Sequence, residues 1–322
     1  MMVRKLACQL LATAALAMVA GQAVAEYPER PITMIVAYSP GGGTDVLARS
    51  FVPFVEKYLG KGASFTVINK PGAGGEVGFT AVAQSQPDGY TIGFLNLPNL
   101  LAIPIERKAR YSMDSFTPLA NMVDDPGAIN VHVDSPFKTL GDLVAFAKEN
   151  PGSVTIGTSG VGGDDHLAIL SFARQADIKV THVPFPGAAP NRTALLGRHI
   201  TAGAFNISEA IQYANEGKIR ILGTMADKRW DQASDVPTFK EQGFDVVMGS
   251  QRGIGAPAGF PEEATKKLSE AIGKAVNDPE FQAKAKKIYL PLRFMPADEY
   301  AAFMKEKDAQ FKALWKEQPW RK

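Results

Sequence analysis

The fold of this chain is decided by the stretch Val36-Ala37-Tyr38-Ser39-Pro40-Gly41-Gly42-Gly43-Thr44-Asp45. It closes the apolar run of residues 32–38, and a helical pattern from Asp45 to residue 59 follows it, with Gly60 as the stop. A strand that breaks into glycines and continues as a helix is typical of an open α/β sheet, where ligands bind at the carboxyl ends of strands. Glycine lets a ligand approach the backbone there, and the helix N-terminus favours an anion.

The same order of strand, turn and helix recurs along the chain. Further strands are predicted at residues 65–68, 90–95, 128–133, 154–157, 180–183 and 219–225, and further helices after residue 71, after Thr139, at 165–175, at 191–196, from Pro261 and from Pro296. This alternation predicts an α/β fold with largely parallel sheets, in two domains or one large one.

A second glycine-rich loop, Thr158-Ser159-Gly160-Val161-Gly162-Gly163, follows the predicted strand at 154–157. Glycines most often make tight turns, and one such cluster alone would indicate nothing more. Two clusters at corresponding strand-to-helix junctions favour a different interpretation. One loop from each half of the chain could hold an anion from two sides.

Other chemistries fit the residues less well. Val46 stands where a dinucleotide fingerprint needs its third glycine, and a Walker lysine is absent. The segment at 157–161 nearly matches a nucleophile elbow, which leaves a serine esterase using Ser159 and His166 as an alternative. The four histidines match no metal spacing, so we expect no metal and no cofactor.

The first 25 residues predict export. Arg4 and Lys5 precede an apolar run too short for a membrane anchor, and Ala23-Val24-Ala25 offers a signal-peptidase site, with cleavage after Ala25. Cleavage would remove the only cysteine and leave equal numbers of basic and acidic side chains. A neutral chain without thiols favours neither nucleic-acid binding nor a disulfide framework.

Motifs over the whole predicted mature chain resemble one family, the solute-binding receptors of tripartite tricarboxylate transporters (Bug or TctC receptors). The motifs are Tyr27-Pro28, Pro31-Ile32, residues 36–45, Asn69-Lys70-Pro71-Gly72-Ala73-Gly74-Gly75, Pro87-Asp88-Gly89-Tyr90-Thr91, Ser135-Pro136-Phe137-Lys138-Thr139-Leu140, Thr158-Ser159-Gly160, His166-Leu167-Ala168, His182-Val183-Pro184-Phe185, Gly217-Lys218-Ile219-Arg220, Asp235-Val236-Pro237-Thr238 and Ala256-Pro257-Ala258-Gly259.

The resemblance implies a two-domain periplasmic-binding-protein fold (Venus flytrap, type II) with the ligand in the interdomain cleft. Domain 1 would hold residues 26–120 and 231–322, and domain 2 residues 121–230. Such a receptor is no enzyme. It would act in the periplasm as a monomer, bind no nucleic acid, and deliver a small organic mono- or dicarboxylate, aliphatic or aromatic, to the membrane permease subunits of the transporter.

The resemblance also implies which residues bind the ligand. The two loops would clasp one carboxylate, and variable residues would contact the distal half. The predicted ligand-binding residues are Tyr38, Ser39, Gly42, Gly43, Thr44, Asp45, Asn96, Thr158, Ser159, Gly160, Val161, Gly163, His166, Phe185, Asn206 and Arg252.

The chain departs from the family pattern at two places. Phe185 and Pro186 stand where many members carry tyrosine and lysine, and Arg252 stands near a common aromatic position. Arg252 could pair with a second carboxylate, which favours a dicarboxylate ligand, or form a surface or hinge salt bridge. Besides the esterase, a sensor that docks on a membrane histidine kinase remains an alternative function.

Overall fold

Strand β1 (Ile32–Val36) shows how the first half of the chain builds its core. Its side chains alternate between two apolar clusters, as the two-residue period of a strand requires. Met34 and Val36 pack with Phe51 and Leu268 on one face of the sheet. Ile35 packs on the other face, in a cluster with buried side chains of the helices there. The computed structural model describes residues 27–60, 62–317 and 319–320, so the predicted signal peptide lies outside the described residues.

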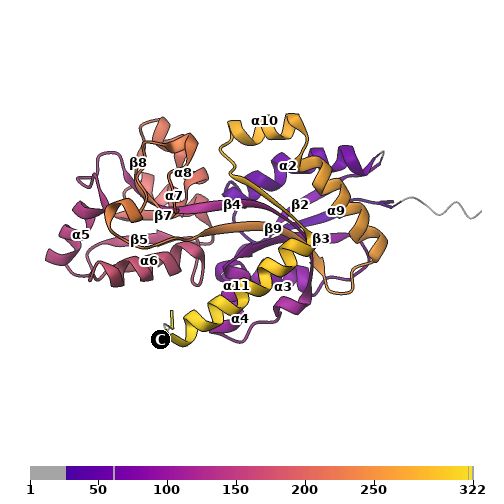
Figure 1. Cartoon of the computed structure of the whole chain (residues 1–322), viewed down its shortest axis with the longest axis horizontal. Helices are drawn as coiled ribbons and strands as arrows, with labels where there is room; N and C mark the ends of the chain where they lie inside the picture. The colour runs from indigo at the N-terminus through magenta and orange to yellow at the C-terminus, as the bar shows by residue number, and fades with distance from the viewer. Residues whose placement is uncertain (1–26, 61, 318, 321–322) are drawn as a thin grey trace, which may run out of the picture.

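The sheet of this first lobe has the order β2-β1-β3-β9-β4, with β10 also paired to β4. Its remaining strands are β2 (Phe65–Asn69), β3 (Thr91–Leu97), β4 (Phe116–His132), β9 (Gly249–Pro257) and β10 (Leu292–Pro296). One face is covered by α2 (Gly43–Leu59), α9 (Glu262–Val276) and α10 (Pro279–Lys287), and the other by α3 (Glu76–Ala83), α4 (Asn99–Glu106) and α11 (Ala297–Glu317), as Figure 1 shows.

The second lobe repeats this layered arrangement around β8-β4-β7-β5-β6. Its strands are β5 (Thr155–Thr158), β6 (Thr181–Pro184), β7 (Ala202–Asn206) and β8 (Ile219–Thr224). Its helices are α5 (Leu140–Glu149), α6 (Asp164–Gln175), α7 (Ala188–Leu196) and α8 (Ile207–Asn215). Short turns lie at η1 (Ala73–Gly75), η2 (Met113–Ser115), η3 (Asp231–Ala233) and η4 (Lys240–Gln242).

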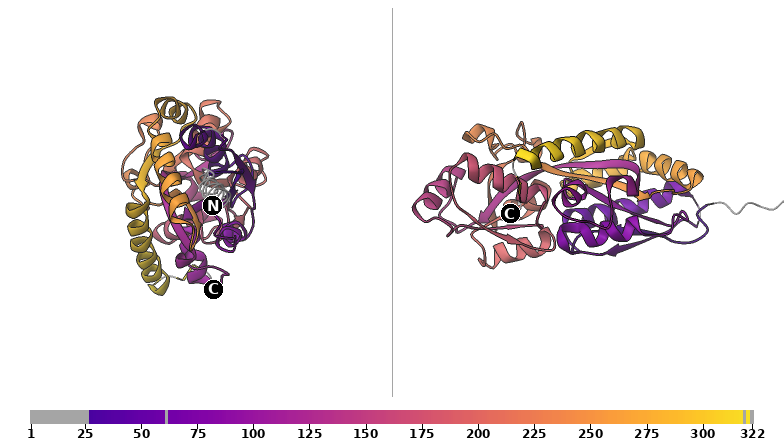
Figure 2. Two further views of the ribbon diagram at one scale, coloured as in Figure 1. Left: turned by 90° about the vertical axis from the view of Figure 1, so that its right-hand side faces the viewer. Right: turned by 90° about the horizontal axis from the view of Figure 1, so that it is seen from below.

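Two long strands, β4 and β9, connect the lobes and run side by side between them (Figures 1 and 2). The strands of each lobe's outer part are parallel, but every pairing that involves β4 or β9 is antiparallel. The prediction of largely parallel sheets is therefore wrong at the junction, because chain segments that pass between lobes and return must run in opposite directions. The α/β fold itself is confirmed.

The lobe boundaries stay a proposal, which the core packing refines. The predicted boundary at residue 120 falls inside β4, and Phe239 and Val246 pack in the second lobe's core, beyond the predicted boundary at 230. We propose that the second lobe comprises residues 127–248 and the first lobe the described residues on either side. Among the described residues, no helix combines the length and apolar character needed to cross a bilayer.

Candidate ligand-binding site

The two glycine-rich loops adopt the same backbone geometry. Gly41 has φ 76 and Gly162 has φ 79, a left-handed conformation that glycine adopts without strain. The next residues, Gly42 and Gly163, are the N-caps of α2 and α6, with φ/ψ of −81/168 and −80/169. The sequence interpretation of the two loops as counterparts is thus supported in their conformation, one loop in each lobe.

Each loop is closed by a side chain four residues further on. Asp45 accepts a hydrogen bond from the backbone N–H of Gly41 at 2.9 Å. His166 accepts one at Nδ1 from the N–H of Gly162 at 3.2 Å. His166 also stacks on His182, with ring centroids 4.2 Å apart. Burial and the neighbouring His182 lower the pKa of His166 to about 4, so the ring is neutral and its Nδ1 is free to accept.

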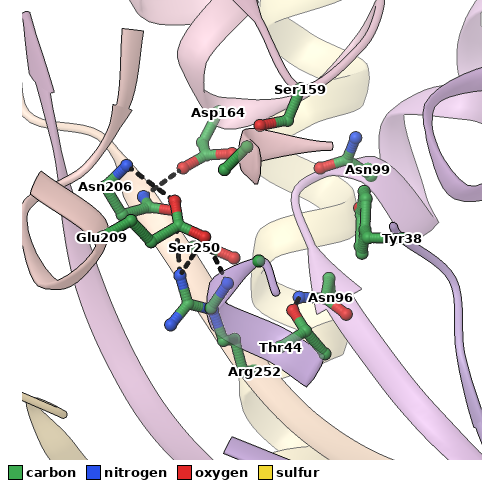
Figure 3. Close-up of a pocket in the computed structure, with 13 residues that line it drawn as sticks. Tyr38, Thr44, Asn96, Asn99, Ser159, Asp164, Asn206, Glu209, Ser250 and Arg252 are labelled. Atoms are coloured by element: carbon green, nitrogen blue, oxygen red, sulfur yellow. Dashed lines mark hydrogen bonds and ion pairs between the residues drawn. The ribbon is translucent and has the colours of Figure 1, made fainter. Parts of the chain in front are cut away.

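The loops border a small cavity of about 30 Å³ between the lobes (Figure 3). Eight predicted residues line it, namely Tyr38, Gly42, Gly43, Thr44, Asn96, Ser159, Asn206 and Arg252. Four others, Gly160, Val161, His166 and Phe185, line a second cleft together with His182. His182 is half-buried there.

The other four predicted residues support the loops and are absent from the described lining of both clefts: Ser39, Asp45, Thr158 and Gly163. Ser39 donates from its N–H and its hydroxyl to the carbonyl of Pro186, across the lobes. Thr158 pairs with His182 at 2.6 Å between Oγ1 and Nε2.

Sequence reasoning missed five residues of the cavity: Asn99, Asp164, Ala188, Glu209 and Ser250. For two of them, the neighbouring sequence contains a signal that could have indicated a place in the cavity. Asp164 is the first residue of α6, directly after the second loop. Glu209 stands three residues after the N-cap Asn206, which is the spacing of a capping box, and the structure contains that box.

Glu209 occupies the anion position at the N-terminus of α2. Its Oε1 accepts a hydrogen bond from the N–H of Gly43 at 2.5 Å, and its Oε2 accepts from the N–H of Asn206 at 3.1 Å. The first contact crosses between the lobes. A carboxylate of the protein itself therefore lies where the sequence predicts the ligand's carboxylate.

Arg252 lies on β9, with 2% of its side chain exposed. Its Nη2 is 2.7 Å from Asp125 Oδ2, 3.0 Å from Asn206 Oδ1 and 3.8 Å from Glu209 Oε1. Arg252 therefore forms a buried ion pair at the junction of the lobes, and the surface salt bridge considered from the sequence is excluded. Its pairing with a ligand carboxylate stays a prediction.

The carboxyl groups around Arg252 are costly to ionise. Burial raises the pKa of Asp125 to about 7, against the opposing effect of Arg252. Burial likewise raises the pKa of Asp164 to about 6, although the amide of Asn206 and the charge of Arg252 lower it. Near neutral pH the cavity is acidic, with one buried arginine to balance several carboxyl groups.

The residues of the alternative esterase do not converge. Ser159 lines the central cavity, whereas His166 lines the second cleft and uses Nδ1 to close its own loop. A nucleophile and its base require a hydrogen bond between them, and none joins these two side chains among the described residues.

A family model described as "Tripartite tricarboxylate transporter family receptor" matches residues 48–319. A Cupriavidus necator protein of the UPF0065 group is 33% identical over 307 residues, which covers 94% of this chain and 93% of that protein. Protein BugT of Bordetella pertussis is 28% identical over 254 residues, covering 78% of this chain and 77% of BugT.

Solved structures show the same fold. The periplasmic binding protein BugD superposes with a TM-score of 0.85 at 29% identity, covering 90% of this chain and 98% of BugD. MatC from Rhodopseudomonas palustris, solved with bound malate, gives 0.83 at 26% identity, covering 89% and 99%. A second R. palustris protein, solved with adipate, gives 0.84 at 26% identity, covering 90% and 97%.

Proposed function

Since the chain belongs to the receptor family of the tripartite tricarboxylate transporters, we propose that it captures a small organic carboxylate in the cleft between its lobes. The observation that carries the proposal is the pair of matched loops, which direct the N-termini of α2 and α6 toward one cavity from opposite lobes. The malate and adipate bound to two related structures support the same ligand class.

The carboxylate would replace Glu209 at the N-terminus of α2. Glu209 shows that the N–H of Gly43 can donate to a carboxylate in the closed arrangement, and the Glu209 side chain can withdraw because it belongs to the other lobe. The distal part of the ligand would then face Asn96, Asn206 and Arg252, which line the same cavity. The ligand would be a mono- or dicarboxylate.

We further propose that the protein is exported to the periplasm after cleavage behind Ala25 and acts as a monomer. Its partners there would be the membrane permease subunits of the transporter, to which the loaded receptor delivers its ligand. Neither step requires catalysis, which agrees with a family of solute-binding proteins and with the separation of Ser159 from His166.

Calorimetry of the mature chain tests this function. The panel would contain aliphatic mono- and dicarboxylic acids, aromatic acids, and amino- and hydroxy-substituted forms of each, with sulfate as an inorganic anion control. We expect saturable one-to-one binding of at least one organic acid and none of sulfate. A folded protein that binds no acid on the panel would overturn the proposal.

A further inference from the structure

The cavity is too acidic to hold a simple carboxylate on its charges alone. Its charged lining residues are Asp164, Glu209 and Arg252, and the charge of Arg252 is already balanced by Asp125 at 2.7 Å. A ligand with only negative charge would join uncompensated carboxylates in a buried site, where repulsion is strong. The charges of the lining therefore favour a ligand that carries a positively charged group.

Asp164 is the acid best placed to meet that group. It is 6% exposed, and its Oδ2 accepts a hydrogen bond from Asn206 Nδ2 at 2.7 Å. The carboxylate also accepts a hydrogen bond from the backbone N–H of Asp165, and no other side chain among the described residues hydrogen-bonds to it. Figure 3 shows the second oxygen on the side of Ser159, facing the cavity. Glu209, in contrast, has both oxygens engaged by backbone N–H groups.

Asn99 provides an independent sign of a ligand at the same end of the cavity. It is 3% exposed, and its Nδ2 donates to the carbonyl of Gly74 at 2.8 Å. Because a carbonyl only accepts, this bond fixes the orientation of the amide. Asn99 Oδ1 then has no hydrogen-bond partner in the described part of the chain, and Figure 3 shows it directed toward Ser159 and Asp164.

The amide of Asn99 lies beside the start of α6. A Cβ atom built on Gly163 would be 2.9 Å from Asn99 Nδ2 and 3.3 Å from Oδ1, so the amide packs directly on the residue before Asp164. The first lobe thus supplies an amide oxygen, and the second lobe a carboxylate and the hydroxyl of Ser159. All three are acceptors, and a protonated amine has three N–H donors to meet them.

We propose that the ligand carries a protonated amine in addition to its carboxylate, and that Asp164, Asn99 and Ser159 bind the ammonium group. This inference rests on the proposed function and narrows its ligand class to amino acids and related zwitterions. The ammonium group cancels the charge of one carboxylate, so an amino acid meets less repulsion in the cavity than the simple acid of the same skeleton.

Matched ligands test the inference by calorimetry at pH 7.5. Each trio has one carbon skeleton with hydrogen, hydroxyl or ammonium at the same position, such as succinate, malate and aspartate, or glutarate, 2-hydroxyglutarate and glutamate, and 4-aminobutyrate is compared with butyrate. We expect the amino form to bind at least tenfold more tightly than both partners in one or more trios.

Asp164→Asn isolates the charge, because it keeps the shape of the side chain. We expect it to weaken binding of the amino form about tenfold to a hundredfold, while binding of the unsubstituted acid stays equal or improves. Asp177→Asn is the matched control, since Asp177 is exposed just beyond the other end of the same helix. Urea unfolding of both variants separates lost recognition from lost folding.

The outcomes separate the two proposals. If unsubstituted or hydroxy acids bind as tightly as amino forms, or Asp164→Asn weakens all of them equally, the ammonium site is refuted and the carboxylate receptor stands. If amines without a carboxyl group, such as putrescine, bind most tightly, the carboxylate function fails while the cation site holds. If nothing on the panel binds, both proposals fail.

Discussion

At the scale of single residues, Gly43 shows how tightly the cavity is built. A Cβ atom there would lie 2.6 Å from Arg252 Nη2 and 2.7 Å from Nη1 and Cζ. The guanidinium is held by Asp125 and Asn206, so it cannot yield to a methyl group at low cost. The loop glycines therefore serve two purposes, since they allow the turn and leave room for a buried arginine.

We expect Gly43→Ala to weaken ligand binding at least tenfold and to destabilise the fold by about 1–3 kcal/mol, the usual cost of overpacking. Calorimetry and urea unfolding measure the two effects. Gly141→Ala serves as the control, because a Cβ there meets nothing closer than Thr139 Oγ1 at 3.5 Å. Unchanged affinity in Gly43→Ala would show that the loop does not contact the ligand.

His166 leads to a prediction about how the stability of the fold depends on pH. Its pKa is lowered to about 4 in the folded protein by burial, while the unfolded chain keeps the ordinary value near 6.5. The unfolded state therefore binds the proton first as pH falls, and the stability that neutral His166 supports is lost progressively between about pH 6.5 and 4.

His166→Gln removes this titration, so the two proteins are compared by urea unfolding at pH 8 and pH 5. Between these values the wild type should lose about 2 kcal/mol more than the variant. The comparison cancels the titrations of Asp125 and Asp164, whose raised pKa values act in the opposite direction. An equal loss in both proteins would contradict a neutral, loop-closing His166.

At the scale of elements, β4 and β9 carry both the fold and the site. β9 pairs with β3 and β4 in the first lobe and places Ser250 and Arg252 in the cavity. β4 contains Asp125, the partner of Arg252, and then pairs with β7 and β8 in the second lobe. The ion pair thus joins the two strands that connect the lobes, so a movement of the lobes would change the contacts of Arg252.

A substitution in helix α9 can stabilise the protein without a change at the ligand-binding site. Gly273 lies inside this helix, and a Cβ there would meet Phe294 Cζ at 3.5 Å, an ordinary contact. We expect Gly273→Ala to stabilise the protein by about 0.5–1 kcal/mol, because alanine loses less entropy in a helix. Urea unfolding measures the gain, and ligand affinity should not change. A loss of stability would mean that the helix packs differently.

At the scale of the whole molecule, contacts between the lobes hold this structure closed. Gly43 donates to Glu209, Ser39 donates to Pro186, and Arg192 donates to the carbonyl of Gly41 at 3.3 Å. Of the residues in these contacts, Glu209 is the one whose carboxylate lies where the ligand's carboxylate is predicted to bind. It would thus act as an internal competitor and as a latch of the unliganded state.

We expect Glu209→Ala to open the unliganded protein, which small-angle scattering would detect as a larger radius of gyration than in the wild type. Saturating ligand should restore the compact form, and carboxylate affinity should rise about threefold to tenfold because no side chain competes. Glu216→Gln, an exposed position next to the same helix, is the control. An unchanged radius of gyration would argue against the latch.

Local patterns determined much of this protein. Strand periodicity at residues 32–38, the two glycine loops and the motifs of the family predicted the α/β fold, the binding-protein architecture and eight of the residues in the cavity. These features are local, because a strand's alternation or a left-handed glycine is set by neighbours within a few residues. The sequence also contained the capping box that places Glu209.

Only the tertiary structure brought the charges together. Asp125, Asp164, Glu209 and Arg252 are far apart in the chain, and their pairing depends on how β4 and β9 pass between the lobes. The same packing left Asn99 Oδ1 and one oxygen of Asp164 facing the cavity. The loops by themselves indicate an anion, and the family motifs indicate a carboxylate. The acidity of the cavity arises because folding buries carboxyl groups that are distant in the sequence close to one another, where their charges interact strongly. The proposed ammonium group of the ligand follows from this acidity.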